Sequence, residues 1–297
     1  MGNASLKKIA VLTSGGDAPG MNAAIRAVVR TANYHKIECV GVRGGYTGLI
    51  EGNFTKMGPR SVSNIINLGG TILRSARSKE FRTEEGRQKA FEQCQKNGID
   101  ALVCIGGDGT FTGAKIFAEE FGVKVIGVPG TIDNDIFGTD FTIGYDTALN
   151  TAMEAIDKIR DTATSHNRVF FIEVMGRDAG FIALNSGIAS GALDILIPEK
   201  KDSLEDLFET FEKAQKRGKT SSIVIVAEGE RLASTYELAE QTKQRFPDYD
   251  IRVSILGHIQ RGGAPSCADR VLASRMGYGA VVGLMKGLTN VMAGIRS

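Results

Sequence analysis

The stretch Ile105-Gly106-Gly107-Asp108-Gly109-Thr110 decides the fold class of this 297-residue chain. It follows the apolar run 101–105, which predicts a buried strand, and it precedes residues 115–118, which predict a helix. A strand, a glycine-rich turn and a helix in this order direct backbone N–H groups at a phosphate. Asp108 would repel a phosphate unless a cation lies between them, so we expect a nucleotide phosphate chain and Mg²⁺. A tight turn with an Asp cap is the alternative interpretation.

The rest of the chain repeats the alternation of strand and helix. The apolar runs are residues 9–13, 37–42, 101–105, 124–128, 169–174, 194–197, 222–227 and 251–256. Helical patterns lie between them, and Ser203-x-x-Asp206 predicts a capping box for one of these helices. The pattern predicts an α/β fold with parallel strands covered on both faces, and a change of domain near residues 137–146.

Composition excludes several classes of protein. The net charge of +2 and the lack of a long Lys/Arg block argue against nucleic acid and anionic membranes as partners. The four cysteines are widely spaced and form no metal motif, and we expect Cys104, in a predicted buried strand, to be a reduced, inert thiol. We see no signal peptide and no apolar stretch long enough to span a bilayer, and therefore expect a cytoplasmic protein.

A second motif, Pro129-Gly130-Thr131-Ile132-Asp133-Asn134-Asp135, follows another strand. Two carboxylates two residues apart repel each other unless they have different tasks. Asp135 can lie near Mg²⁺ while Asp133 accepts a proton from an attacking hydroxyl. An Asx-rich turn with solvated carboxylates is the alternative, but it does not explain the neighbouring Thr and Gly.

Two further loops combine glycine with basic side chains, namely Met175-Gly176-Arg177-Asp178 and Gly257-His258-Ile259-Gln260-Arg261-Gly262-Gly263. Arginine binds phosphate with two parallel hydrogen bonds, and together with Arg168 and Arg252 these loops predict a sugar-phosphate pocket. His258 alone would be interpreted as structural. Arg26 and Arg30, four residues apart on one helix face, would by default be solvated.

Taken together and in order, these motifs and Ser14-Gly15-Gly16-Asp17-Ala18-Pro19-Gly20-Met21-Asn22 resemble bacterial ATP-dependent 6-phosphofructokinases over essentially the whole chain. The resemblance implies transfer of the ATP γ-phosphoryl group to the 1-hydroxyl of fructose 6-phosphate. It also implies two three-layer α/β/α domains with mostly parallel sheets and an active site in the cleft between them. Residues 1–143 and 258–297 would form the larger, ATP-binding domain, and residues 144–257 the smaller, fructose 6-phosphate-binding domain.

The resemblance assigns roles to individual residues, with Mg²⁺ held by Asp108 and Asp135. Asp133 is expected to be the general base, assisted by Thr131, Arg77 and Arg177. The residues expected to bind ATP are Gly16, Tyr46, Arg77, Ser78, Gly107, Asp108, Gly109 and Thr110. Those expected to bind fructose 6-phosphate are Thr131, Ile132, Asp133, Arg168, Met175, Gly176, Arg177, Glu228, Arg252, His258, Ile259, Gln260 and Arg261. Arg168 and Arg252 are expected to reach the substrate of a neighbouring subunit in a homotetramer.

Gly109 and Gly130 favour ATP as the phosphoryl donor. Pyrophosphate-dependent relatives tend to carry Asp and Lys at these positions, and an Asp at position 109 would crowd and repel the α-phosphate. A pyrophosphate-dependent enzyme, a kinase of another substrate and a non-catalytic effector-binding paralogue are the alternatives. A coupled assay with ATP or pyrophosphate separates them.

The resemblance also implies a site for ADP or phosphoenolpyruvate as effector. Its expected residues are Arg26, Arg30, Arg160, Arg217 and Lys219. Leu193 and Ser221 stand where relatives often carry Glu and His, so we expect weakened ADP activation. Family members usually continue beyond residues 290–295 with a strand and a helix, which we expect this chain to lack.

Overall fold

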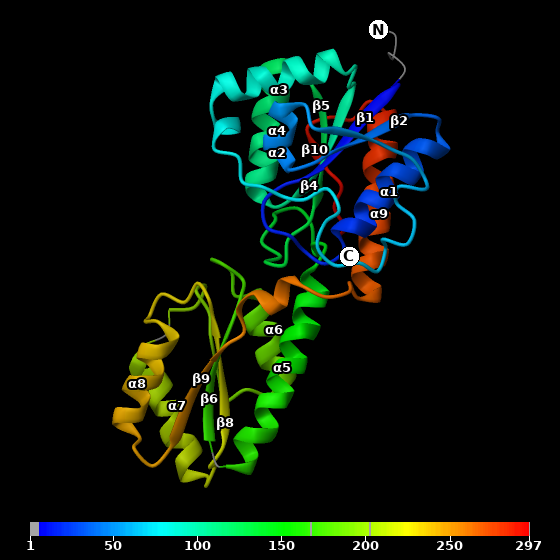
Figure 1. Ribbon diagram of the computed structural model, residues 1–297. Coiled ribbons are helices and arrows are strands. Elements are labelled where there is room, and N and C mark those ends of the chain that lie inside the picture. Colours follow the sequence, from blue (N-terminus) through cyan, green and yellow to red (C-terminus); the bar gives the residue numbers. More distant parts are fainter. Residues whose placement is uncertain (1–5, 167, 202, 297) are drawn as a thin grey trace. The chain divides into compact units, whose positions relative to one another are not determined.

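The structure is a computed structural model that describes residues 6–166, 168–201 and 203–296 (Figure 1). The chain divides into two compact units. Unit 1 comprises residues 1–132, 136–146 and 261–297, and unit 2 comprises residues 133–135 and 147–260. The two units are described separately below.

Unit 1 contains a six-stranded sheet in the order β10-β5-β4-β1-β2-β3. Its strands are β1 (Lys8–Thr13), β2 (Glu38–Val42), β3 (Phe54–Met57), β4 (Ala101–Gly106), β5 (Lys124–Pro129) and β10 (Val291–Met292). All neighbours are parallel except β2 and β3. The expectation of a mostly parallel α/β fold is confirmed. The antiparallel edge strand β3 was not expected, because its four residues, Phe-Thr-Lys-Met, form no continuous apolar run.

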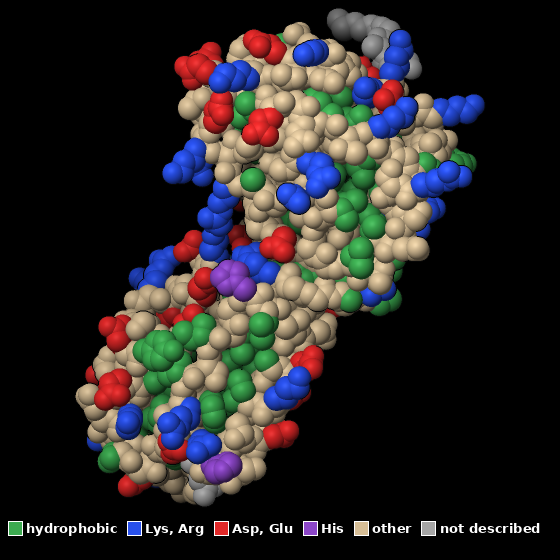
Figure 2. Space-filling model, in the orientation of Figure 1, with side chains coloured by type: hydrophobic (Ala, Val, Ile, Leu, Met, Phe, Trp, Pro, Cys, Tyr) green, Lys and Arg blue, Asp and Glu red, His purple; other side chains and the backbone are tan. Residues whose placement is uncertain are grey.

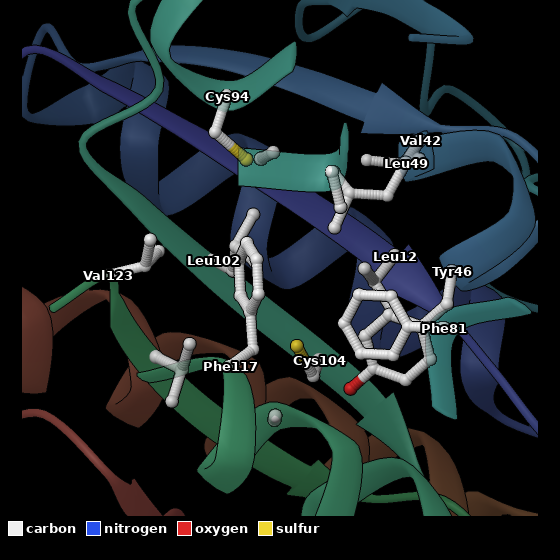
Figure 3. Close-up of a cluster of buried hydrophobic side chains, with 14 of the residues drawn as sticks. Leu12, Val42, Tyr46, Leu49, Phe81, Cys94, Leu102, Cys104, Phe117 and Val123 are labelled. Carbon is white, nitrogen blue, oxygen red and sulfur yellow. The ribbon is translucent and has the colours of Figure 1, made fainter. Parts of the chain in front are cut away.

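Helices cover both faces of this sheet because successive strand residues point to opposite sides. Ala10, Leu12 and Leu102 contribute to a core with the helices α2 (Gly45–Glu51), α3 (Glu84–Lys96) and α4 (Asp108–Phe121), shown in Figure 3. The 3₁₀ helix η1 (Glu80–Arg82) adds Phe81 to this core. The helices α1 (Met21–Tyr34) and α9 (Cys267–Met285) pack against each other and lie over the other face (Figure 1).

Unit 2 contains a fully parallel four-stranded sheet in the order β7-β8-β6-β9. Its strands are β6 (Arg168–Val174), β7 (Asp194–Leu196), β8 (Ser222–Ala227) and β9 (Asp250–Ile255). One core is formed with α7 (Leu204–Lys216) and α8 (Thr235–Arg245), whose Phe211 and Leu238 are buried. The helix α6 (Phe181–Ser190) packs on β6, β7 and β8, and α5 (Tyr145–Ser165) lies beside it (Figure 1). The capping box expected at Ser203 and Asp206 is present.

Three of the four cysteines are buried, and all four are free. Burial raises the pKa of the Cys104 thiol to about 12, so the thiol stays protonated and unreactive near neutral pH. Charged side chains of both signs are interspersed over the face of each unit drawn in Figure 2. In the part of the chain that the structure describes, no helix is long and apolar enough to cross a membrane.

Candidate functional site

The expected phosphate cradle lies where β4 ends and α4 begins. Gly107 is the N-cap residue of α4, and no side chain caps the helix there. Asp108 and Gly109 occupy the first turn and are exposed, whereas Thr110 is buried. A helix N-terminus without a side-chain cap offers backbone N–H donors and a partial positive charge to an anion. The turn can therefore bind phosphate, and the exposed carboxylate of Asp108 is available to a cation.

Hydrogen bonds tie the loop after β1 to this cradle. Ser14 N–H donates to the carbonyl of Ile105 at 3.0 Å, and the Thr110 hydroxyl donates to the carbonyl of Ser14 at 3.1 Å. The hydroxyl of Ser75 donates to the carbonyl of Gly15. The two glycine-rich loops are thus held as one structure, although they are about ninety residues apart in sequence.

Arg261 also lies against the loop after β1. Its Nη1 donates to the carbonyl of Asp17 at 3.3 Å. A Cβ atom at Gly16 would lie 2.8 Å from the same Nη1, so glycine is what lets the guanidinium approach this closely. The structure therefore brings Gly16, expected to bind ATP, next to Arg261, expected to bind the sugar phosphate.

Tyr46 is almost completely buried, with 4% of its surface exposed. Its ring stacks on Phe81 with a centroid distance of 3.9 Å (Figure 3). Its hydroxyl donates to the carbonyl of Thr110 at 2.6 Å. Burial, with a contribution from Cys104, raises the pKa of the Tyr46 phenol well above its ordinary value. Tyr46 thus contacts the first turn of α4 from the buried side, as a neutral hydrogen-bond donor.

The remaining residues expected to bind ATP lie on the segment before η1. Arg77 is exposed and Ser78 is half-buried. The Ser78 hydroxyl accepts a hydrogen bond from Phe81 N–H at 3.2 Å, which fixes the start of η1. Arg77 is free to reach a phosphate, whereas Ser78 already has a structural partner.

The motif after β5 passes from one unit to the other. Thr131 and Ile132 belong to unit 1 and are buried, and the carbonyl of Thr131 accepts a hydrogen bond from the Thr142 hydroxyl at 2.7 Å. Asp133 and Asp135 belong to unit 2. Asp133 is 6% exposed, whereas Asp135 is exposed. The two carboxylates therefore have different environments, and their separate roles stay predictions.

In unit 2, one turn brings together five of the residues expected to bind the sugar, namely Met175, Gly176, Arg177, Glu228 and Gln260. Met175 N–H donates to Oε1 of Gln260 at 3.3 Å, and Arg177 N–H donates to Oε2 of Glu228 at 3.2 Å. Gly176 has a φ of +148°, and Arg177, although not a glycine, has a φ of +58°. The side chains of Arg177 and Glu228 are exposed, whereas Met175 and Gly176 are buried.

Gln260 differs from the other residues expected to bind substrate. It is 0% exposed, and its Nε2 donates to the carbonyl of Gly257 at 3.0 Å. Because both ends of the amide have protein partners, its evident task is to hold the turn at Met175. Its neighbours His258 and Ile259, in the 3₁₀ helix η2 (Gly257–Arg261), are exposed.

The structure brings Arg168 and Arg252 together on adjacent strands. Arg168 Nε lies 2.7 Å from Oδ2 of Asp250, and Arg252 Nε lies 3.0 Å from Oδ1 of the same carboxylate. Hydrogen bonds from Arg168 first and then from Arg252 lower the pKa of Asp250. Two guanidinium groups around one carboxylate keep a net positive charge, which suits an anionic ligand.

The residues expected at an effector site lie on several elements. Arg26 and Arg30 are one turn apart on α1 in unit 1, where burial and the charge of Arg30 lower the pKa of Arg26. Arg160 in unit 2 donates to the carbonyl of Ser190. Arg217 and Lys219, at the end of α7, are exposed.

Sequence reasoning did not single out Asp250 or Phe81. The pattern Asp250-x-Arg252 on a strand places both side chains on one face, so it could have indicated an ion pair. Nothing local in the sequence indicates that Phe81 stacks on Tyr46, because the two residues come from different elements.

The chain is an α/β protein in which glycine-rich and charged loops follow the ends of parallel strands, the place where such folds usually bind ligands. The Phosphofructokinase family model matches residues 8–284, and the chain belongs to this family. The chain is 58% identical over 291 residues to ATP-dependent 6-phosphofructokinase 2 of Bacteroides thetaiotaomicron, covering 98% of this chain and 89% of that protein. It is 57% identical over 289 residues to ATP-dependent 6-phosphofructokinase 1 of Thermus thermophilus, covering 97% and 89%.

Solved structures agree with this assignment. Phosphofructokinase from Saccharomyces cerevisiae superposes with a TM-score of 0.90 and is 40% identical, covering 94% of this chain. This chain spans 42% of the yeast chain's length. Pyrophosphate-dependent phosphofructokinase from Marinobacter aquaeolei has a TM-score of 0.83 over 96% of this chain and 78% of that one, but at 24% identity it shows only the shared fold.

Proposed function

We propose that this protein is a kinase that transfers the γ-phosphoryl group of ATP to the 1-hydroxyl of D-fructose 6-phosphate. The observation that carries the proposal is the near-full-length identity of 57–58% to relatives that are named ATP-dependent 6-phosphofructokinase. The products are fructose 1,6-bisphosphate and ADP. This reaction is the committed step of glycolysis.

The binding of ATP is proposed for unit 1. The first turn of α4, from Gly107 to Thr110, offers backbone N–H groups to the phosphates, and Gly16 lies in the loop bonded to it. Arg77 adds an exposed positive charge. The open space beside Gly109 supports a nucleotide over pyrophosphate, because no atom outside its own helix turn lies within 4 Å of a Cβ atom built there.

The carboxylates of Asp108 and Asp135 would hold Mg²⁺, and their donor chemistry fits this ion. Mg²⁺ usually keeps several waters and takes one or two carboxylates together with substrate phosphates. Both carboxylates are exposed, and no group of three or more His, Cys, Asp or Glu suited to a metal exists among the described residues. When bound, Mg²⁺ would neutralise charge on the ATP phosphates.

The binding of fructose 6-phosphate is proposed for the turn at Met175–Arg177 with Glu228, and for the basic residues His258 and Arg261. Asp133 accepts the proton of the attacking 1-hydroxyl, and Thr131 helps to orient the sugar. Arg177 stabilises the charge that develops during transfer. Positioning and electrostatics of this kind account for most catalysis of phosphoryl transfer.

The pair Arg168 and Arg252 would bind the 6-phosphate of a neighbouring subunit in a homotetramer. The support for this role is their common ion pair with Asp250, which orients both guanidinium groups. Under the same proposal, Arg26, Arg30, Arg160, Arg217 and Lys219 receive an anionic effector such as ADP or phosphoenolpyruvate. A titration of activity with Mg-ADP tests the weak activation expected from Leu193 and Ser221.

A coupled assay with fructose 6-phosphate and either ATP or pyrophosphate tests the function. We expect turnover with ATP and none with pyrophosphate. Asp133→Asn should lower kcat by about 10²–10⁴-fold, because it removes the base without changing side-chain volume. Asp157→Asn, the same change at an exposed position of α5, is the matched control. Turnover by the folded wild-type protein with pyrophosphate and not with ATP would reject the proposal in favour of a pyrophosphate-dependent enzyme. Absence of turnover with either donor would reject it in favour of a non-catalytic paralogue.

A further inference from the structure

The backbone of Arg177 adopts a conformation that a residue with a side chain rarely takes. Its φ of +58° lies in the left-handed region, where the Cβ atom of a non-glycine residue comes too close to the following carbonyl oxygen. Such a conformation persists only where the surroundings impose it. The direction of the Cα–Cβ bond, and therefore the path of the Arg177 side chain, depends on what holds this turn.

Gly229 leaves room for the Arg177 peptide. A Cβ atom built at position 229 would lie 2.0 Å from the carbonyl oxygen of Arg177 and 3.0 Å from the Cα atom of Asp178. Both contacts are with backbone, which cannot rotate away as a side chain could. Gly229 is not among the residues with positive φ, so the requirement for glycine comes from this close approach and not from its own conformation.

Glu199 holds the other end of the same turn. Its Oε1 accepts a hydrogen bond from Gly180 N–H at 2.8 Å, just before the first residue of α6. A carboxylate at a helix N-terminus is favoured by the helix dipole and by the free N–H groups there. Glu199 lies three residues beyond the end of β7, far from Arg177 in sequence.

We propose that Gly229 and Glu199 are positioning residues for Arg177. Gly229 sets the place of the Arg177 peptide by leaving its carbonyl room, and Glu199 fixes the end of the turn at Gly180. Together they determine where the guanidinium of Arg177 is presented. This inference rests on the proposed function, which assigns Arg177 to the sugar phosphate and to the transferred phosphoryl group.

The first test is Gly229→Ala, which must displace the Arg177 carbonyl. Because a misplacement of about 1 Å in a catalytic group can cost 10²-fold, we expect kcat/KM for fructose 6-phosphate to fall by about tenfold to a hundredfold. The KM for ATP should not change. The control is Gly187→Ala, which also crowds unit 2, but there the three nearest atoms belong to the side chain of Ile195 and not to backbone. If Gly229→Ala acted only through a general loss of stability, kcat/KM for fructose 6-phosphate would fall equally in both variants, and the proposal would be wrong.

A double variant separates positioning from structure. If Gly229 acts through Arg177, Gly229→Ala should cost little more once Arg177→Ala has removed the side chain. Additive losses in the double variant would show that Gly229 acts independently of Arg177 and would overturn the proposal.

Glu199→Gln provides a second test that introduces no steric clash, and it decides the matter if Gly229→Ala does not fold. It should raise the KM for fructose 6-phosphate severalfold and leave the KM for ATP unchanged. The matched control is Glu205→Gln, the same change in the first turn of α7. A folded variant at either position with wild-type kinetics for fructose 6-phosphate refutes the inference. Failure of the proposed function is distinct, because the wild-type protein itself would then not phosphorylate fructose 6-phosphate.

Discussion

The hydroxyl of Tyr46 is the most informative single group to remove. It donates to the carbonyl of Thr110 at 2.6 Å, inside the first turn of α4, while the ring stacks on Phe81. Tyr46→Phe keeps the ring and its stacking and removes only this hydrogen bond. The substitution therefore tests whether the buried tyrosine positions the phosphate cradle.

The magnitude follows from the loss of one buried, neutral hydrogen bond. Such a bond contributes about 0.5–1.5 kcal/mol to stability. If the whole of this free energy is expressed in ATP binding, the KM for ATP should rise about twofold to tenfold. The melting temperature should fall by about 2–4 °C per kcal/mol lost.

Steady-state kinetics and a thermal melt together measure both quantities. The KM for fructose 6-phosphate should stay constant, because its proposed residues lie on other segments. Tyr34→Phe is the matched control, since Tyr34 is 82% exposed at the end of α1 and should change neither quantity. A melting temperature that falls while the KM for ATP remains at the wild-type value would show that the hydroxyl stabilises the core without positioning the cradle.

Three further predictions concern the donor, the acceptor and stability. Gly109→Asp should abolish turnover with ATP, whereas Gly109→Ala should retain it because a Cβ atom there meets open space; unchanged ATP turnover in Gly109→Asp would contradict the assigned donor site. Asp250→Ala should raise the KM for fructose 6-phosphate, because Arg168 and Arg252 lose the carboxylate that orients them, and Asp248→Ala is the exposed control; a lower KM would mean that Asp250 merely competes with phosphate. Glu120→Gln should destabilise the protein in a pH-dependent way, because hydrogen bonds from the buried Arg87 lower the pKa of Glu120. A carboxyl whose pKa is lower in the folded protein stabilises the fold at pH values above its unfolded-state pKa, and this stabilisation is lost as the pH falls through its folded-state pKa. The wild type should therefore resist urea better than Glu120→Gln above about pH 5. The difference in stability should vanish as the pH falls well below about 4.

The sequence alone was enough to predict the class of fold and most of the strands. Apolar runs bounded by glycine and proline locate β1, β4, β5, β6 and β8, because buried parallel strands need continuous apolar sequence. The edge strand β3 was not predicted for the same physical reason, since its two central residues, Thr55 and Lys56, are polar and exposed and interrupt any apolar run. The candidate ligand residues were also proposed from the sequence, because glycine and charge together after a strand are typical of phosphate sites, and their binding roles stay predictions.

Only the tertiary structure decided how these residues are held. Tyr46 meets Phe81 and Thr110, and Asp250 meets Arg168, through contacts between elements that no local pattern encodes. The same holds for Gly229, whose lack of a side chain matters because the Arg177 carbonyl of another loop lies beside it. Local sequence determines periodicity, caps and turns, since these depend on neighbouring residues. The packing of one loop against another depends on the whole fold. The positions of the candidate site residues are therefore determined by the tertiary structure and not by the local sequence.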